Sequence, residues 1–242
     1  MFIPPINPTN TINTGAGNDN VHISKAEGLA GLLGLYKVEI NGQTQYMTKQ
    51  QLENTQFNLG SGNDRIVVDA NVTADIHANG GCGNDTMVGG AGDDVFNGGC
   101  GNDKQWGRGG NDKLDGGCGN DYQNGGTGND RMYGGHGNDT QVGGAGNDYQ
   151  NGGCGNDRQY GNTGNDTQVG GHGHDYQNGG WGNDRQYGNH GNDVQVGGHG
   201  NDYQNGGFGN DWQFGNHGND LQVGGPGWDA QFGGPGFDFR LP

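Results

Sequence analysis

Residues 80–88, with the sequence Gly-Gly-Cys-Gly-Asn-Asp-Thr-Met-Val, decide the fold, because the chain repeats this nine-residue pattern without insertion or deletion up to Leu241. When the unit is numbered from one to nine, Gly stands at positions one and four and Asp at position six in all 18 copies. Position two is Gly in all but a few copies, and position five is nearly always Asn. A short fixed period of this kind predicts a solenoid built by stacking one structural unit per repeat.

The nine positions divide into a turn and a strand. Gly permits positive φ, and Asn and Asp tolerate turn conformations, so the first six positions favour a turn. The last three are too few for a helix and predict a brief strand, in which position eight points to one side and positions seven and nine to the other. We therefore expect a right-handed coil of short parallel strands, with neighbouring strands about 4.8 Å apart.

Position six carries the chemistry. Stacking places these carboxylates in columns at the strand spacing, where unneutralised charges repel one another. Calcium relieves this repulsion, because it accepts carboxylates and backbone carbonyls at flexible geometry, and glycine-rich turns leave carbonyls unshielded. In the alternative, Asp serves only as a turn former, but turn formation alone would accept Asn or Ser in some copies.

The unit resembles the Gly-Gly-x-Gly-x-Asp-x-U-x nonapeptide of the repeats-in-toxin (hemolysin-type) calcium-binding family, over about two thirds of the chain. The resemblance implies an all-β fold, a parallel β-roll with two nonapeptides per coil and several calcium ions between successive turns. A degenerate copy at residues 57–64 adds Asp64 to the implied ligands. The full set of calcium ligands implied in this way is Asp64, Asp85, Asp94, Asp103, Asp112, Asp121, Asp130, Asp139, Asp148, Asp157, Asp166, Asp175, Asp184, Asp193, Asp202, Asp211, Asp220 and Asp229.

The resemblance says less about biological role, since the module is attached to lyases, proteases, adhesins, toxins and surface-layer proteins. It implies a secreted or cell-surface bacterial protein that stays unfolded until it meets extracellular calcium. No nucleophile–base pair or pair of catalytic carboxylates stands apart from the repeat, so we expect a structural protein and not an enzyme. The alternatives are a carbohydrate- or ice-binding module and a metal-free, self-associating solenoid.

Position eight departs from the family pattern. It is normally a large aliphatic residue inside the roll, but it is Gln at Gln105, at Gln123 and in every copy from Gln141 to Gln231. A buried amide without a partner costs about 1–3 kcal/mol. Stacked amides can satisfy one another along the solenoid axis, and this ladder is the preferred interpretation. The alternative, a strand rotated to bury positions seven and nine, would place Tyr, Arg and Asn inside.

A longer period leaves the number of sides open. From about Thr140 the strand triplets cycle as Thr-Gln-Val, Tyr-Gln-Asn and Arg-Gln-Tyr, and Asn replaces Gly at Asn162, Asn189 and Asn216, each 27 residues apart. In one interpretation the duplicated unit was 27 residues; in the other, 27 residues form one coil of a three-sided solenoid. We favour the two-sided roll with 18 residues per coil on the family resemblance.

Cys and His recur at position three. In an 18-residue coil, Cys82, Cys100, Cys118 and Cys154 share one face with three histidines, at positions 136, 172 and 190. Three hypotheses apply: unremarkable exposed residues, a disulfide, and a site for a soft metal such as zinc or copper.

Composition limits the possible partners. Only 27% of the 242 residues are hydrophobic and 59 are Gly, so order depends on the repeat and on metal. The formal charge of −16 and the lack of a basic patch exclude nucleic acid, and no apolar run reaches the roughly 20 residues that span a bilayer. Neither a Sec signal nor a secretion segment after the repeats is seen, which leaves the export route open.

We expect three regions. Residues 1–56 form an N-terminal capping region, residues 57–79 the degenerate first rungs, and residues 80–241 the repeat solenoid with an aromatic C-terminal cap. A proline-rich lead at 1–14 precedes a lone Gly-x-Gly-Asn-Asp turn at 15–19, which either binds an ion or is an ordinary turn.

Within the capping region, capping boxes at 24–27 and 48–51 predict short helices at 25–33 and up to residue 54. Between them, strands at 36–40 and 43–47 flank an Asn-Gly turn. A strand is also predicted at 72–77. Self-association is expected through the solenoid ends or through the Tyr-rich outer face, which could also bind a polysaccharide.

Overall fold

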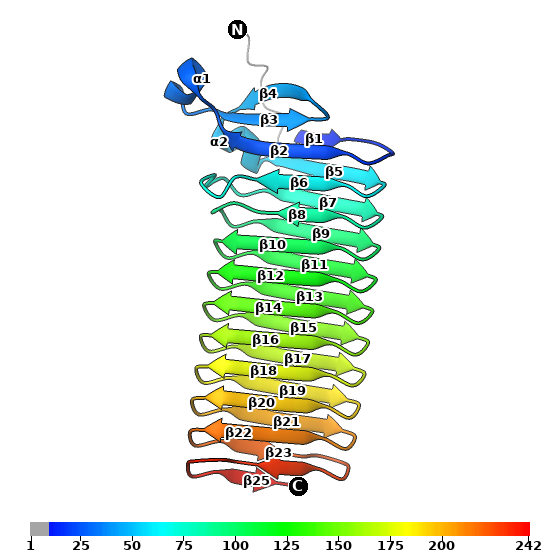
Figure 1. Ribbon diagram of the computed structural model, residues 1–242, viewed down its shortest axis with the longest axis vertical. Coiled ribbons are helices and arrows are strands. Elements are labelled where there is room, and N and C mark those ends of the chain that lie inside the picture. The colour runs from blue at the N-terminus through cyan, green and yellow to red at the C-terminus, as the bar shows by residue number, and fades with distance from the viewer. Residues whose placement is uncertain (1–9) are drawn as a thin grey trace.

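The repeats stack into a long two-sheet β-solenoid, seen in Figure 1 with the chain descending from the N-terminal to the C-terminal end. The computed structural model describes residues 10–242, so the first nine residues of the predicted proline-rich lead lie outside the described part. Strands of successive nonapeptides alternate between the sheets, and parallel neighbours join residues two nonapeptides apart, as Tyr122 and Thr140 do. The all-β roll with two nonapeptides per coil is confirmed, and the three-sided alternative is wrong.

Sheet A, as we name the 12-stranded sheet, contains β1 (Asn10–Asn13), β5 (Thr55–Ser61), β7 (His77–Cys82), β9 (Val95–Cys100), β11 (Lys113–Cys118), β13 (Arg131–His136), β15 (Tyr149–Cys154), β17 (Thr167–His172), β19 (Arg185–His190), β21 (Tyr203–Phe208), β23 (Leu221–Val223) and β25 (Phe239–Leu241). Sheet B, the 13-stranded sheet, contains β2 (Asn20–Lys25), β3 (Tyr36–Ile40), β4 (Gln43–Met47), β6 (Arg65–Val68), β8 (Thr86–Val88), β10 (Lys104–Gly109), β12 (Tyr122–Thr127), β14 (Thr140–Ala145), β16 (Arg158–Thr163), β18 (Tyr176–Trp181), β20 (Val194–His199), β22 (Trp212–His217) and β24 (Ala230–Phe232).

The strands are longer than the predicted three residues. A typical one, β12, runs from position seven of one repeat through the two glycines to position three of the next. The turn is therefore only Gly-Asn-Asp. Position two has positive φ in the copies other than that of Gly90, even where it is not Gly, as at Arg108 (76°) and Asn162 (73°), because the chain bends there before the next turn. Asn is among the few residues that tolerate this conformation, which explains its recurrence at this position.

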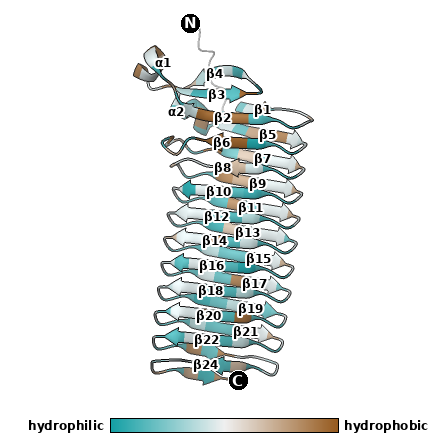
Figure 2. Cartoon of the chain, viewed as in Figure 1, coloured by the Kyte–Doolittle hydropathy of each residue, from teal (hydrophilic) through white to brown (hydrophobic). Residues whose placement is uncertain are grey.

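Position eight faces the interior of both sheets, as the ladder interpretation requires. The N-terminal coils hold a hydrophobic cluster that extends in sheet A to Phe96, Leu114 and Met132. Beyond these residues the interior consists of fully buried Gln, beginning at Gln105 in sheet B and Gln150 in sheet A. In Figure 2, large brown segments mark β2 and β6, whereas the later strands are mostly white and teal. The core thus changes from apolar to amide along the axis.

The N-terminal hairpin forms as predicted, with β3 and β4 antiparallel around the Asn-Gly turn. The helix α2 (Lys49–Glu53) is also confirmed, and Thr48 and Gln51 form its capping box. The capping box predicted at residues 24–27 is wrong, because Ser24 lies in β2 and α1 (Gly28–Leu32) has Glu27 as its N-cap residue, without a side-chain cap. Pairing of β2 with β3 outweighs the local helix signal there.

The predicted strand at residues 72–77 is also wrong for most of its length. Only His77 belongs to a strand, β7, while Val72, Ala74 and Ile76 lie buried in an irregular connection. This coil is longer than the coils that follow it, since Asp64 and Asp85 stand 21 residues apart and later partners 18. The alternation of apolar residues at 72–77 correctly indicated a buried segment. The additional residues of this coil, however, keep the segment from pairing with the neighbouring strands.

Candidate calcium-binding site

The position-six carboxylates form two buried columns, one along each edge of the solenoid. In each column, Oδ1 accepts a hydrogen bond from the backbone N–H of the Asp one coil earlier; Asp121, for example, donates to Asp139 at 2.7 Å. The first column consists of Asp19, Asp64, Asp85, Asp103, Asp121, Asp139, Asp157, Asp175, Asp193, Asp211 and Asp229. The second consists of Asp94, Asp112, Asp130, Asp148, Asp166, Asp184, Asp202, Asp220 and Asp238.

All the residues predicted as ligands therefore lie in these columns, and two further residues join them. Asp19 heads the first column, because its N–H donates to Asp64 at 2.7 Å across 45 residues of sequence. Sequence reasoning had left this turn undecided, although its Gly-x-Gly-Asn-Asp matches the repeat. Asp238 ends the second column, where it accepts from Asp220 at 3.2 Å. Asp229 is only half-buried, since the stack ends beside it.

The second carboxylate oxygen, Oδ2, is buried without a hydrogen-bond partner along most of both columns. Asp94 is different, because its Oδ2 accepts from the N–H of Gly90 at 2.9 Å. A buried acceptor without a donor is costly, and a carboxylate oxygen in that state is a natural cation ligand. These repeated Oδ2 atoms are the strongest sign of a ligand in the described structure.

The position-one Gly provides room for Oδ2. A side-chain carbon added at Gly116 would stand 2.5 Å from Oδ2 of Asp121 and 2.6 Å from the carbonyl oxygen of Gly134, one coil later. Those two oxygens therefore converge on the space that the missing side chain leaves. The same arrangement recurs along both columns. It explains why Gly at position one accompanies Asp at position six in every copy, and sequence reasoning missed this glycine as part of the site.

Burial raises the pKa of the column carboxyls. The pKa of Asp103 rises to about 6, that of Asp139 to about 7 and that of Asp112 to about 8, mainly because of desolvation and against the lowering effect of the backbone hydrogen bond to Oδ1. Neighbouring carboxyls in the column raise the pKa further. The carboxyls of Asp103, Asp139 and Asp112 therefore favour either a proton or a nearby cation near neutral pH.

These residues fit calcium. At most of the position-one glycines, Oδ2 and a glycine carbonyl oxygen border the same space, and hard oxygen donors of both kinds suit this ion. Within residues 10–242, no three His, Cys, Asp or Glu side chains gather around one point. The columns would therefore bind calcium with one carboxylate per repeat together with backbone carbonyls, and not with a cluster of acidic side chains.

A two-sheet β-solenoid with buried Asp columns and glycine-lined oxygens defines the class of nonapeptide-repeat rolls. The RTX calcium-binding nonapeptide repeat model matches residues 9–22, 77–105, 101–123, 115–150, 151–186 and 178–213, more than half of the chain. The chain belongs to this RTX calcium-binding repeat family. No curated protein and no solved structure matches it. In the described residues, no helix has the length and apolar character needed to cross a bilayer.

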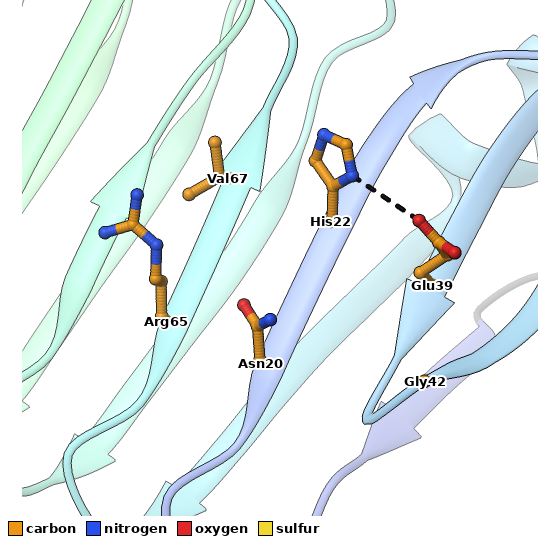
Figure 3. Close-up of a pocket in the computed structure, with 6 residues that line it drawn as sticks. All are labelled: Asn20, His22, Glu39, Gly42, Arg65 and Val67. Carbon is orange, nitrogen blue, oxygen red and sulfur yellow. Dashed lines mark ion pairs between the residues drawn. The ribbon is translucent and has the colours of Figure 1, made fainter.

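A polar recess lies at the N-terminal end, away from the Asp columns. Figure 3 shows it between β2, β3 and β6, with Asn20, His22, Glu39 and Arg65 among its lining residues. The side chains come from three neighbouring strands and lie at the surface. The prediction that the chain has no catalytic residues stays a prediction.

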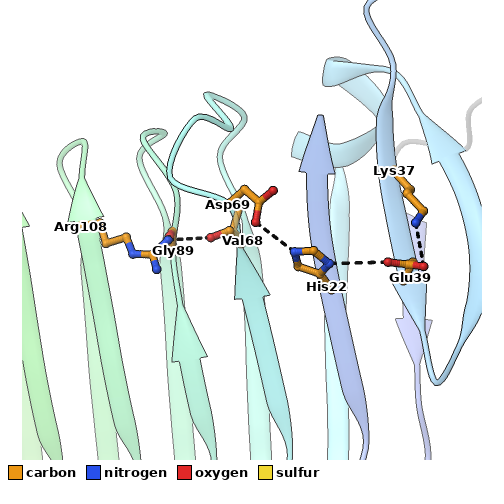
Figure 4. Close-up of polar contacts among 7 residues, drawn as sticks. All are labelled: His22, Lys37, Glu39, Val68, Asp69, Gly89 and Arg108. Atoms are coloured by element: carbon orange, nitrogen blue, oxygen red, sulfur yellow. Dashed lines mark hydrogen bonds and ion pairs between the residues drawn. The ribbon is translucent and has the colours of Figure 1, made fainter. Parts of the chain in front are cut away.

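Polar contacts across this end tie the first coils together (Figure 4). His22 lies between two carboxylates, with Nε2 3.0 Å from Asp69 and Nδ1 3.6 Å from Glu39, and Lys37 pairs with Glu39 at 2.8 Å. Arg108 donates to the carbonyls of Val68, at 2.8 Å, and Gly89, at 3.2 Å, beside the longer connection. These contacts connect the hairpin and the irregular coil to the regular stack.

Proposed function

We propose that calcium binds along both Asp columns and that this binding drives folding of a secreted structural β-roll. The observation that carries the proposal is the row of buried Oδ2 atoms without hydrogen-bond partners. A row of this kind is unfavourable in a metal-free protein at neutral pH, while calcium would turn the same oxygens into ligands.

In this proposal each group has a defined part. Oδ1 accepts the hydrogen bond from the backbone N–H of the neighbouring coil, which fixes the orientation of the carboxylate. Oδ2 and the carbonyl oxygen of the position-one Gly would face the ion. Calcium supplies positive charge between carboxylates that would otherwise repel one another. Since the columns exist only in the stacked fold, binding free energy becomes folding free energy, and folding would follow export to a calcium-rich exterior.

The test is a calcium titration of metal-depleted protein monitored by far-UV circular dichroism. We expect a cooperative transition from coil to β structure that equimolar magnesium does not reproduce, because magnesium demands a stricter geometry. A β spectrum already complete without metal would contradict the proposal.

A pair of variants makes the titration specific to the columns. Asp148→Asn retains an oxygen to accept the N–H of Asp130 but loses one carboxylate, so the transition should move to higher calcium concentration. Asp93→Asn is the matched control, because Asp93 is exposed at position five, where most copies already have Asn. The control should move the transition much less than Asp148→Asn does, because Asp93 lies outside the column and acts on Asp94, Asp112 and Asp130 only through its charge.

The proposed location, structural role, division into regions and self-association rest on the family and on the sequence. The repeats typify secreted bacterial proteins, which supports an extracellular or cell-surface location and a structural, non-enzymatic role. Residues 1–56, 57–79 and 80–241 would act as cap, first rungs and calcium solenoid. Self-association would use the solenoid ends, where Trp228, Phe237 and Phe239 are largely exposed.

A metal-free solenoid remains the competing function, and the Gln ladder favours it. Each interior Gln is hydrogen-bonded to its neighbours in the stack, so the core itself does not need an ion. The same titration separates the two functions, since a solenoid held by amides alone forms its β spectrum without calcium.

A carbohydrate-binding face is supported by the outer surface of the sheets. Tyr133 packs on Tyr149, with ring centroids 5.8 Å apart, and Tyr187 packs on Tyr203 at 5.6 Å, both on sheet A. Arg131 and Arg185 belong to the same strands as the first Tyr of each pair. The position-six carboxylates are buried and do not reach this outer surface. The outer surface of sheet A therefore presents arginine side chains, although the protein as a whole is acidic. Retardation in gels that contain an acidic polysaccharide, but not a neutral one, would support this face; equal mobility in both would contradict it.

A further inference from the structure

The edge of sheet A carries an unbroken column of thiols and imidazoles at position three. The parallel register places Cys82 beside Cys100 and Cys100 beside Cys118. The column continues through His136, Cys154, His172 and His190 in successive strands of the sheet. All seven side chains lie at the surface, with only Cys154 partly covered. The structure thus aligns seven soft-metal ligands without interruption.

The opposite edge shows that position three does not demand these residues. In sheet B the same position holds Gly109, Thr127, Ala145 and Thr163 in register, followed by Trp181, His199 and His217, so that column includes imidazoles but no thiol. The backbone is the same on both edges, so turn formation does not account for the thiols. Packing does not account for them either, because Cys82, Cys100 and Cys118 are exposed.

The spacing disfavours a disulfide and suits a bridging ion. Side chains on in-register strands project in parallel, so their Cβ atoms keep roughly the 4.8 Å strand spacing, above the 3.5–4.5 Å typical of a disulfide. The four cysteines are accordingly free. Two metal–thiolate bonds of about 2.3 Å, placed end to end, nearly span the same distance. A cation there would also relieve the repulsion between adjacent thiolates.

From this geometry we infer that Cys82, Cys100 and Cys118 bind monovalent copper, with one ion on each side of Cys100. Thiolates select Cu(I), and each ion takes two sulfurs from neighbouring strands; because the two ions share Cys100, the three thiols together release three protons. A straight column gives any ion only its two neighbours, so it does not surround zinc with four ligands. Cys100 is the shared ligand. This site is separate from the Asp columns and does not depend on which ion they bind.

The test uses reduced, calcium-treated protein titrated anaerobically with Cu(I) against a chromogenic Cu(I) chelator. We expect about two ions to be retained per chain, about one in Cys82→Ser, and none at these thiols in Cys100→Ser. The reason for the last result is that Cys82 and Cys118 are two strand spacings apart, about 9.6 Å, too far to share an ion. Equal losses in the two variants, or complete removal of copper by the chelator, would overturn the inference.

A transplant to the other edge supplies the matched control. Thr127→Cys alone adds a thiol without a thiol neighbour, whereas Thr127→Cys with Ala145→Cys recreates an in-register pair. Only the double variant should gain an ion, and far-UV circular dichroism should show each variant folded as the parent. A gain of copper in the single variant would show that exposed thiols bind it without pairing and would overturn the inference. A double variant that folds but gains no ion would do the same.

Discussion

Gln168 donates one amide hydrogen to Oε1 of Gln150 at 2.8 Å and another to the carbonyl of Asn178 at 3.0 Å. Its own Oε1 accepts from Gln186 at 2.8 Å. Both hydrogens and the oxygen are therefore used inside a fully buried core. Each such Gln is hydrogen-bonded in two directions, along the stack and across to the other strand of the coil. These hydrogen bonds make a polar interior stable.

We expect Gln168→Leu to destabilise the fold by about 3 kcal/mol or more, because it leaves three buried groups without partners at about 1–3 kcal/mol each. Urea unfolding measures the effect. Gln231→Leu is the control, since Gln231 is only partly buried at the end of the ladder and water can replace its contacts. Equal losses at the two positions would argue against a mutually dependent ladder.

Gly116→Ala should both weaken calcium binding and destabilise the protein by about 1–3 kcal/mol, since the new methyl group meets Oδ2 of Asp121 and the carbonyl of Gly134. Gly109→Ala tests the same substitution at position three, where the nearest atom, Oγ1 of Thr127, is 3.3 Å away and belongs to a side chain. Calorimetric calcium titration of both variants separates the effects. A harmless Gly116→Ala would mean that the position-one space is not part of the site.

Asn189→Val should lower the free energy of unfolding by about 1–2 kcal/mol, because a β-branched residue is strained at the φ of 74° found there. Asn189→Gly should be close to neutral, as Gly is the residue at this position in most copies. Thermal unfolding in saturating calcium measures both. Tolerance of Val would show that the bend at position two is not fixed by the stack.

The metal-free protein should become less stable as pH rises from about 4 to about 8. Asp in the unfolded chain has an ordinary pKa of 3.8, whereas the fold raises the pKa of Asp139 to about 7 and that of Asp112 to about 8. The folded state therefore binds more protons in this interval, and stability is lost as they leave. Far-UV circular dichroism of the metal-free protein between about pH 4 and pH 8 checks the sign, since the β signal should decrease as pH rises. Saturating calcium should abolish or reverse the trend, since calcium replaces the protons.

Local signals in the N-terminal region predicted structure unevenly. Thr48 and Gln51 form the expected capping box, because nothing else competes for that segment. The equivalent signal at Ser24 failed, since β2 pairs there with both β3 and β6. The alternation at Val72, Ala74 and Ile76 predicted burial but not pairing. Where the local signal failed, contacts with segments elsewhere in the sequence decided the structure.

By itself, the sequence determined the solenoid, the inward position of Gln and the columns of Asp, because a strict nine-residue period fixes what stacks on what. Only the tertiary structure decided that 18 residues make a coil, although the side chains cycle every 27, because backbone hydrogen bonds set the stack whatever the side chains are. It also joined Asp19 to Asp64 and showed why position one is Gly. Those relationships depend on atoms from neighbouring coils, which no local pattern contains.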